Sequence, residues 1–192
     1  MSKQFDLLVI GGGPAGYIAA IRAAQLGLNV ACCESNAYAD PQGAPRLGGT
    51  CLNVGCIPSK ALLHTSHLFA EAQHSFAEQG IQVKGLDIDV GTMLDRKNKI
   101  VQQLTSGIKG LFKKNKVTLL NGHGSLVAQS AAGWQVQVAN DLIEAKQVII
   151  ATGSKARHLP GVNVDNQIVC DNVGALDLQQ VPKKLAIIGA GV

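Results

Sequence analysis

Cys51 and Cys56 are the residues of this chain whose types and spacing best suit redox chemistry. In an ideal α-helix, residues five positions apart have Cα atoms roughly 8.5 Å apart. A disulfide bond needs a Cα separation of about 4.4–6.8 Å. A bridge between these cysteines therefore requires a distorted turn, for which Gly55 supplies the backbone freedom. A bridge across such a turn is expected to be easily reduced, as a catalytic disulfide must be.

Other interpretations of this cysteine pair stay open at the level of residue types. The spacing does not match that of zinc ligands, and no second cysteine or histidine pair accompanies it, so no metal site is expected. Two buried thiols without a bridge are the structural alternative. If the pair lies near a helix start, the helix dipole stabilises the thiolate, which is the reactive form.

A glycine-rich turn, Gly11-x-Gly13-x-x-Gly16, points to a site for the phosphates of a dinucleotide. Gly11 permits the sharp turn, Gly13 lets a pyrophosphate approach the backbone, and Gly16 lets helix and strand pack closely. Pro14 suits the first turn of the following helix, whose N-terminal N–H groups favour phosphate. Glu34, 18 residues after Gly16, is placed to accept both ribose hydroxyls and to repel a 2′-phosphate. The motif does not separate FAD from NAD, and a glycine turn without a ligand is the alternative.

The elements that must position these residues follow from hydrophobic periodicity and from the glycines and prolines between periodic segments. The predicted elements, in chain order, are a strand at 5–10, a helix at 14–27, a strand at 28–34, a helix at 50–79 ended by Gly80, an irregular or edge-strand segment at 81–89, a helix at 90–116, a strand at 117–120, a small antiparallel meander at 125–128, 134–138 and 142–146, and a buried strand at 147–151. The first three form a βαβ unit. The expected fold class is α/β: a Rossmann-like domain with a central parallel sheet, two long helices and a small antiparallel β-meander.

Several polar or reactive side chains are predicted to be structural. Cys32 and Cys33 lie in an apolar run and are expected to be inert and buried. The predicted apolar side of the helix at 90–116 consists of Met93, Leu94, Ile100, Leu104, Ile108, Leu111 and Phe112. Its predicted solvated basic side consists of Arg96, Lys97, Lys99, Lys109, Lys113, Lys114 and Lys116. The helix-borne histidines, predicted to lie on the surface, are His64, His67 and His74.

The composition is that of an ordinary folded protein. The 192 residues, 46% of them hydrophobic, suffice for one full-size domain and a stub of a second. A net charge of +4 is too small and too scattered to indicate nucleic-acid binding. No apolar run reaches the length of a membrane span, and the N-terminus lacks the core of a signal peptide. Five cysteines, an odd number, therefore favour the reducing cytoplasm over a disulfide-stapled extracellular scaffold.

One internal repeat bears on domain organisation. The segment at 7–13 and the segment at 185–191 both read as a strand followed by Gly-x-Gly, and the second stops before its third glycine is due. We therefore expect a domain at 1–154 and, at 155–192, a linker with the truncated first strand and turn of a second nucleotide-binding domain. The chain is accordingly expected to be a piece of a longer protein.

The run from Gly48 to Leu63 resembles the active-site signature of the flavoprotein disulfide reductases, the pyridine nucleotide-disulfide oxidoreductase family. Within that family the chain is most similar to the dihydrolipoyl dehydrogenases. Glutathione and mercuric reductases typically carry Val where this chain has Leu52 and Ile57, and glutathione reductases tend to carry Lys at Ser59. The likeness extends over 5–192, less than half the length of a typical family member.

The resemblance implies an activity and a role for each matched residue. The activity is oxidation of the dihydrolipoyl groups of 2-oxoacid dehydrogenase complexes, through a Cys51–Cys56 disulfide and FAD, to NAD⁺. Cys51 matches the thiol that exchanges with substrate, and Cys56 matches the thiol that lies against the flavin ring. The residues matched to the FAD site are Gly11, Gly13, Pro14, Gly16, Glu34, Ser35, Gly49, Thr50, Lys60, His123, Gly124, Ala151, Thr152, Gly153 and Ser154. Gly189 and Gly191 match the start of the NAD site.

The resemblance also implies partners. They are the lipoyl domains of these complexes and of the glycine cleavage system, and a second copy in a homodimer; neither nucleic acid nor a membrane is among them. The family's catalytic histidine and its glutamate, which the other subunit contributes, have no match here. A glutathione- or mercuric-type reductase is the alternative activity, and an inactive FAD-binding module is the alternative for the chain alone. The segment at 38–46 looks longer than in many relatives and is given no function.

Overall fold

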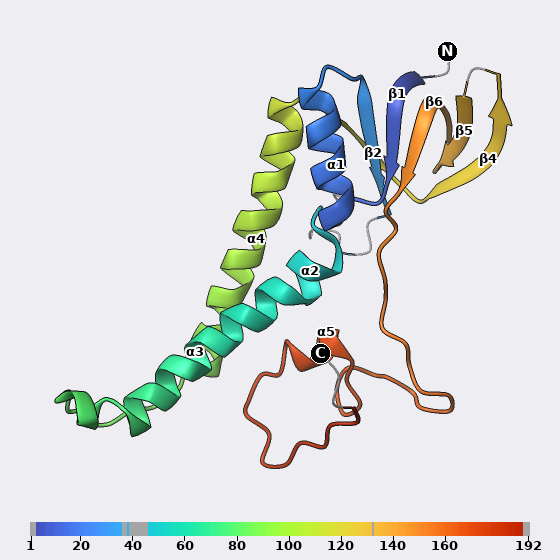
Figure 1. The fold of residues 1–192 in the computed structure, drawn as a ribbon. Helices are drawn as coiled ribbons and strands as arrows, with labels where there is room; N and C mark the ends of the chain where they lie inside the picture. Colours follow the sequence, from blue (N-terminus) through green and yellow to red (C-terminus); the bar gives the residue numbers. More distant parts are fainter. Residues whose placement is uncertain (1–2, 36–37, 39–45, 132, 190–192) are drawn as a thin grey trace.

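The structure, a computed structural model, describes residues 3–35, 38, 46–131 and 133–189. A six-stranded sheet carries helices α1 and α4 on one side, and α3 with the first half of α4 projects from it as a helical arm (Figure 1). The elements are β1 (Lys3–Ile10), α1 (Pro14–Gln25), β2 (Val30–Glu34), α2 (Gly49–Val54), α3 (Cys56–His74), the 3₁₀ turn η1 (Ala77–Gln79), α4 (Val90–Lys114), β3 (Thr118–Asn121), β4 (Gly124–Ser130), β5 (Gly133–Val138), β6 (Asp141–Ile150) and α5 (Asn172–Ala175). The βαβ unit predicted at the N-terminus is confirmed as β1, α1 and β2.

The predicted parallel sheet and the predicted meander are parts of one mixed sheet, with strand order β3-β2-β1-β6-β5-β4. Strand β6 joins them, because it pairs in parallel with β1 and antiparallel with β5. Separate strands at 142–146 and 147–151 were therefore a wrong prediction. The segment at 141–150 contains no glycine or proline that would interrupt it, so it forms a single strand of 10 residues.

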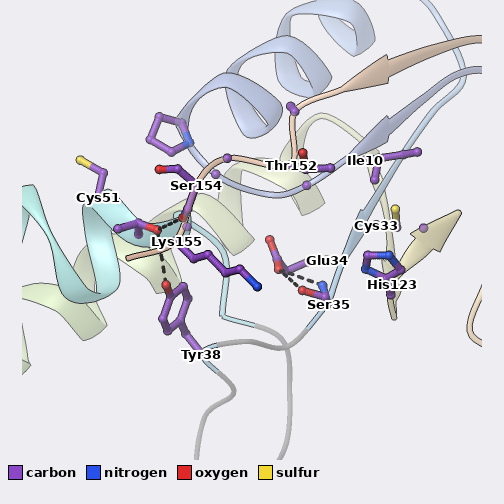
Figure 2. A pocket seen from close by; sticks show the side chains of 18 of the residues that line it. Ile10, Cys33, Glu34, Ser35, Tyr38, Cys51, His123, Thr152, Ser154 and Lys155 are labelled. Carbon is purple, nitrogen blue, oxygen red and sulfur yellow. Dashed lines mark hydrogen bonds between the residues drawn. The ribbon is translucent and has the colours of Figure 1, made fainter. Parts of the chain in front are cut away.

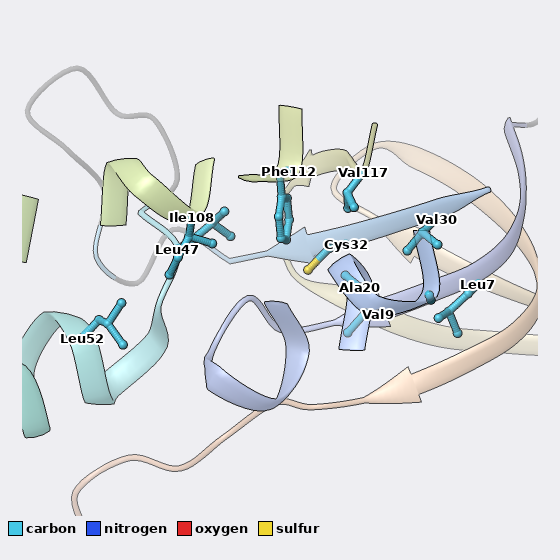
Figure 3. Close-up of a cluster of buried hydrophobic side chains, with 11 residues drawn as sticks. Leu7, Val9, Ala20, Val30, Cys32, Leu47, Leu52, Ile108, Phe112 and Val117 are labelled. Carbon is cyan, nitrogen blue, oxygen red and sulfur yellow. The ribbon is translucent and has the colours of Figure 1, made fainter. Parts of the chain in front are cut away.

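The core that faces α1 and α4 is built from alternate residues of the parallel strands (Figure 3). Leu7 and Val9 of β1 lie on this side, together with Cys32 of β2. Leu8 and Ile10 belong to the cluster on the opposite side of the sheet, as the period of two in a strand requires. Cys32 and Cys33 are buried as predicted, since both faces of β2 are covered.

The long helix predicted at 50–79 is two helices. It breaks at Gly55, the residue from which a distorted turn was expected, and α3 ends at His74 rather than at Gln79. A Cβ on Gly55 would lie 2.9 Å from the carbonyl oxygen of Thr50, so the break brings two backbone segments into close contact. After the short turn η1, Gly80 takes a left-handed conformation with φ of 81° and ends the helical region as predicted.

Helix α4 buries a different side from the predicted one. Leu94, Ile108 and Phe112 are buried as expected, whereas Leu104 and Leu111 are 41% and 45% exposed. The buried positions of the helix are Leu94, Lys97, Val101, Thr105, Ile108 and Phe112. Apolar residues occur on more than one side of this helix, and contacts with α1, α2 and α3 decide which of them is covered.

Lys97 was wrongly placed on a solvated basic side. Its side chain is buried, and its Nζ donates to the carbonyl oxygen of Leu176 at 2.8 Å and to Oδ1 of Asp177 at 3.0 Å. These acceptors lie 79 and 80 residues further along the chain, so no local pattern could show them. His64, His67 and His74 are exposed as predicted.

The segment after β6 runs away from the sheet and carries α5 (Figure 1). The predicted strand at its end is not formed: Leu185, Ile187 and Ile188 are 65–84% exposed and pair with no described strand. A strand needs a neighbouring strand for its backbone hydrogen bonds, and the described residues supply none here. Among the described residues, no helix is both long enough and apolar enough to span a bilayer.

Candidate functional site

A cavity of about 570 Å³ opens where the parallel strands β1, β2 and β6 end. This edge is where open α/β sheets bind ligands. The cavity is lined by Ile10, Gly11, Gly13, Pro14, Cys33, Glu34, Ser35, Tyr38, Gly49, Thr50, Cys51, Gly122, His123, Gly124, Ala151, Thr152, Gly153, Ser154 and Lys155 (Figure 2). Its volume lies within the range usual for small-molecule and cofactor pockets.

The three glycines of the N-terminal turn have different reasons to be glycine. A Cβ on Gly16 would lie 1.7 Å from the carbonyl oxygen of Gly11, which confirms the close helix-to-strand packing predicted there. Gly11 has φ of 105°, and its Cβ would lie 2.3 Å from the carbonyl oxygen of Ala151. A Cβ on Gly13 would meet only the Cα of Gly49, at an ordinary 3.7 Å. The space beside Gly13, on the cavity wall, is therefore not filled by described protein atoms and is open to a ligand.

Glu34 stands at the end of β2 and ties the sheet to the glycine turn. Its Oε2 accepts a hydrogen bond of 2.8 Å from the backbone N–H of Gly12, and its Oε1 accepts one of 2.8 Å from the N–H of Ser35. The hydroxyl of Ser35 also donates to Oε1, at 3.3 Å. Two backbone donors thus hold the carboxylate on the cavity wall, and Oε2 keeps a further lone pair for a ligand hydroxyl.

The cysteine-bearing segment is pinned to the same wall. The N–H of Gly48 donates to the carbonyl oxygen of Gly12 at 2.8 Å. The hydroxyl of Thr50 donates to the carbonyl oxygen of Ser154 at 3.2 Å, and Tyr38 Oη lies 3.4 Å from Thr50 Oγ1. These bonds join the glycine turn, the start of α2 and the end of β6 around one cavity.

Cys51 and Cys56 lie at the starts of two consecutive helices, α2 and α3, and are both free thiols in the structure. Burial chiefly raises the pKa of Cys51, and the neighbouring Cys56 thiol raises it further through a hydrogen bond and charge repulsion. The backbone N–H of Cys56 and the charge of Lys60 act in the opposite direction on this pKa. Burial thus outweighs the helix-start stabilisation expected for this thiolate.

Cys51 lines the cavity, whereas Cys56 is exposed and lies outside the cavity lining. The roles that the sequence assigned put Cys56, not Cys51, beside the flavin. That assignment stays a prediction, and the position of Cys51 makes the reversed assignment the alternative to be tested.

The fold brings most of the candidate residues to the cavity. Those in its lining are Gly11, Gly13, Pro14, Glu34, Ser35, Gly49, Thr50, Cys51, His123, Gly124, Ala151, Thr152, Gly153 and Ser154. Gly16 is not in the lining, but it packs against Gly11, which is. Lys60 is exposed on α3, outside the lining. Gly189 lies far along the exposed C-terminal segment, and Gly191 and positions 39–45 of the predicted long loop lie outside the described residues.

Sequence reasoning missed four residues of the lining: Ile10, Cys33, Tyr38 and Lys155. Gly122, also in the lining, belongs to the same turn as His123 and Gly124, which the resemblance matched to the adenine. Lys155 directly follows the strand-end motif at 151–154, and this adjacency was a signal that could have found it. In Figure 2 its side chain extends over the cavity in the direction of Glu34. Tyr38 belongs to a loop in which no motif marked it.

Comparison with known proteins shows the family of this chain. A family profile described as pyridine nucleotide-disulphide oxidoreductase matches residues 5–192. The chain belongs to the pyridine nucleotide-disulphide oxidoreductase family. The assignment from the Gly48–Leu63 signature is thereby confirmed.

Individual relatives of this oxidoreductase chain bear one recurring name. It is 66% identical over 192 residues to the dihydrolipoyl dehydrogenase of Cupriavidus necator, covering 100% of this chain and 40% of that protein. It is 51% identical to the mitochondrial dihydrolipoyl dehydrogenase of Pisum sativum, covering 99% and 36%. It is also 49% identical to a leghemoglobin reductase of Vigna unguiculata, covering 99% and 35%. The chain thus spans 40% or less of the length of these curated relatives.

The fold of this family member also matches a solved structure. LpdA of Mycobacterium tuberculosis superposes with a TM-score of 0.79 at 23% identity, covering 94% of this chain and 38% of that one. At this identity the likeness concerns the fold, and it confirms the Rossmann-like α/β class.

Proposed function

We propose that the protein carrying this chain is a dihydrolipoyl dehydrogenase, which oxidises dihydrolipoyl groups through a Cys51–Cys56 disulfide and FAD to NAD⁺. One observation carries the proposal: Cys51, one of two neighbouring thiols, lines a cavity whose wall includes a dinucleotide-type glycine turn. The name shared by relatives 66% and 51% identical supports the same activity.

The residues of the cavity fit FAD. The open space at Gly13 and the free N–H groups at the start of α1 suit a pyrophosphate. Glu34, His123 and Gly124 also line the cavity. Glu34 would bind a ribose, and His123 and Gly124 would contact the adenine, as the resemblance implies. FAD, when bound, supplies the two-electron acceptor for the dithiol. The backbone at 151–154 and Thr50 would line the opposite end, beside the cysteine segment.

The chain's own chemistry is thiol–disulfide exchange, starting from the oxidised pair. A substrate thiolate attacks the Cys51 sulfur, the Cys51–Cys56 bond breaks, and Cys56 leaves as a thiolate. The second substrate thiol then attacks the substrate sulfur of the mixed disulfide, which releases the cyclic disulfide product and the Cys51 thiol. Two electrons have then passed from substrate to the cysteine pair. The proton of the second substrate thiol goes to Cys51, and the proton lost when the first substrate thiolate formed goes to the proton acceptor named below.

Two groups in the structure support the thiolate form of Cys51. They are the backbone N–H of Cys56 at the start of α3 and the charge of Lys60, one turn further along that helix. Both lower the pKa of Cys51 against the larger effect of burial. Lys60 is therefore proposed to assist the thiol directly, in addition to the place near the flavin that the resemblance gives it.

The remaining parts of the reaction are proposed from the family. The NAD site would begin at Gly189 and Gly191, and the proton acceptor would be a histidine of the second subunit of a homodimer. The partners would be lipoyl domains of 2-oxoacid dehydrogenase complexes and of the glycine cleavage system. The cytoplasm is the proposed location.

The test of the activity uses the protein at the full length of its relatives, reconstituted with FAD. NAD⁺ reduction by dihydrolipoamide is the expected result. If the protein instead reduces glutathione disulfide or mercuric ion with NADPH, and does not reduce NAD⁺ with dihydrolipoamide, it is one of the other reductases. FAD retention by residues 1–192 alone, seen as yellow colour after purification, shows whether this part is a binding module by itself.

The two thiol roles are tested with Cys51→Ser and Cys56→Ser in the same protein. The thiol that lies against the flavin ring gives the reduced protein a long-wavelength charge-transfer absorbance. Under the proposed roles, Cys56→Ser abolishes this absorbance and Cys51→Ser retains it. If the pattern is reversed, the cavity-lining Cys51 is the thiol beside the flavin and the roles must be exchanged.

A further inference from the structure

A short segment far along the chain contacts the break between the two cysteine-bearing helices. Asn172, the first residue of α5, donates a hydrogen bond of 2.6 Å from its Nδ2 to the carbonyl oxygen of Val54. Val54 is the last residue of α2 and directly precedes Gly55, where the helix breaks. The carbonyl groups at a helix end have no partner within the helix, so a donor from elsewhere fixes the position of this one.

The segment that carries Asn172 is itself anchored to α4. Lys97, only 5% exposed, donates from its Nζ to the carbonyl oxygen of Leu176 at 2.8 Å and to Oδ1 of Asp177 at 3.0 Å. A buried ammonium group without acceptors is costly, so α4 holds these two residues firmly. Residues 171–177 are called the clamp segment below.

Internal hydrogen bonds stiffen the clamp segment. The carboxylate of Asp171 caps α5 by accepting from the N–H of Val173 at 2.8 Å. The side-chain oxygen of Asn166 accepts from the N–H groups of Asp171 and Gly174, both at 3.1 Å. Gly174 is buried, and a Cβ there would lie 2.6 Å from this Asn166 oxygen. Asn172 is therefore presented to Val54 from a rigid support.

We propose that Asn172 is a positioning residue for the redox pair: by holding the Val54 carbonyl, it fixes the break at Gly55 and with it the approach of the Cys51 and Cys56 sulfurs. In an unbroken helix the two Cα atoms would stand roughly 8.5 Å apart, too far for a bridge. Holding the broken geometry raises the effective concentration of one thiol at the other. The inference rests on the proposed function, since it concerns the same disulfide.

The experiment measures the equilibrium of the cysteine pair with glutathione in the full-length protein. One glutathione disulfide oxidises the two thiols to the Cys51–Cys56 bridge and yields two glutathione molecules. Alkylation and mass spectrometry quantify both forms of the pair. For Asn172→Ala, the equilibrium constant for bridge formation falls about fivefold, the size expected for one net hydrogen bond. Since a tenfold change equals about 30 mV, the midpoint potential rises by about 20 mV.

Matched variants separate the hydrogen bond from other effects. Asn172→Asp keeps the size of the side chain but removes the donor, and it lowers the constant at least as far as Asn172→Ala. Asn163→Ala changes an exposed asparagine of the same C-terminal segment, whose side chain forms no hydrogen bond with any residue that the structure describes, and leaves the constant unchanged. Lys97→Met lowers the constant in the same direction. In the double variant with Asn172→Ala, the equilibrium constant for bridge formation falls no further than in the more strongly affected single variant. Both substitutions act through the same clamp segment, so their effects do not add.

An unchanged constant in Asn172→Ala and Asn172→Asp, with circular dichroism and thermal melting like those of the unaltered protein, would overturn the clamp. Additive effects of Lys97→Met and Asn172→Ala would also contradict it, since independent contributions exclude a shared support. Failure of the unaltered protein to form any Cys51–Cys56 bridge is a different outcome, and it would remove the proposed function itself.

Discussion

The carboxylate of Glu34 accepts a hydrogen bond of 2.8 Å from the backbone N–H of Gly12, across 22 residues of sequence. The same side chain accepts the N–H of Ser35. It closes the end of β2 onto the glycine turn and lines the cavity, where Oε2 keeps one lone pair beyond its bond to Gly12.

Glu34→Gln should therefore lower both stability and cofactor affinity. One of the two backbone donors would face an NH₂ group instead of an oxygen, so the free energy of unfolding should fall by about 1–2 kcal/mol. We expect the FAD dissociation constant to rise about tenfold, since the ribose also loses an acceptor. Urea unfolding and FAD titration measure the two effects. Glu78→Gln, on the exposed turn η1, is the control, and equal effects in both variants would contradict the argument.

Two glycine variants should separate folding from ligand binding. Gly16→Ala places a Cβ 1.7 Å from the Gly11 carbonyl oxygen and should cost about 2–4 kcal/mol of stability. Gly13→Ala meets only an ordinary 3.7 Å contact, so its stability should stay within about 0.5 kcal/mol of the unaltered protein. FAD binding should nevertheless weaken at least about tenfold in Gly13→Ala, because the methyl group occupies the space for the phosphates. Full FAD affinity in a folded Gly13→Ala protein would exclude the proposed phosphate site.

Lys155 should contribute charge to cofactor binding. It is the one lysine or arginine among the described residues that line the cavity, where a pyrophosphate would bring negative charge close to Glu34. Lys155→Met should raise the FAD dissociation constant about three- to tenfold at low salt and less at high salt, because ions screen the attraction. Lys183→Met, exposed in the same C-terminal segment, should leave binding unchanged. A loss that is independent of salt would point to packing instead.

Lys60 should shift the pH profile of Cys51. Burial raises the pKa of this thiol, and the charge of Lys60 opposes that rise. Lys60→Met removes the stabilisation of the anion, so the pKa should rise further and the thiolate fraction at neutral pH should fall. Iodoacetamide labelling of Cys51 in the reduced protein should slow about two- to fivefold near pH 8, with its profile displaced to higher pH. Lys84→Met is the exposed control; a displacement to lower pH would refute the role of Lys60.

Local features of the site were predictable because their causes are local. Pro14 starts α1 as expected, and Gly27 follows its end with φ of 90°. The close packing of Gly16 follows from a motif of six residues. A distorted turn at Gly55 was expected because two thiols five positions apart cannot meet on a straight helix, although a single helix was predicted over this region.

Features that depend on distant parts of the chain were not predictable. The sequence of β6 does not show that the strand pairs in parallel with β1 and antiparallel with β5, because local residue types do not specify which strands lie beside it. The buried side of α4 depends on its contacts with α1, α2 and α3, and two of its predicted apolar residues stay exposed. The burial of Lys97 was not predictable because it depends on the contact with Asp177, which only the tertiary structure brings beside this helix.

By itself, the sequence determined the family, the glycine turn, the reactive cysteine pair and the order of most elements, since each rests on residues near one another in the chain. The tertiary structure alone decided that Glu34, Thr50, Cys51 and Lys155 share one cavity and that Asn172 touches the break between the thiols. The hydrogen bonds that tie these segments together span 22 to 118 residues of sequence, and only the closing of the sheet and the docking of α4 bring their partners within reach.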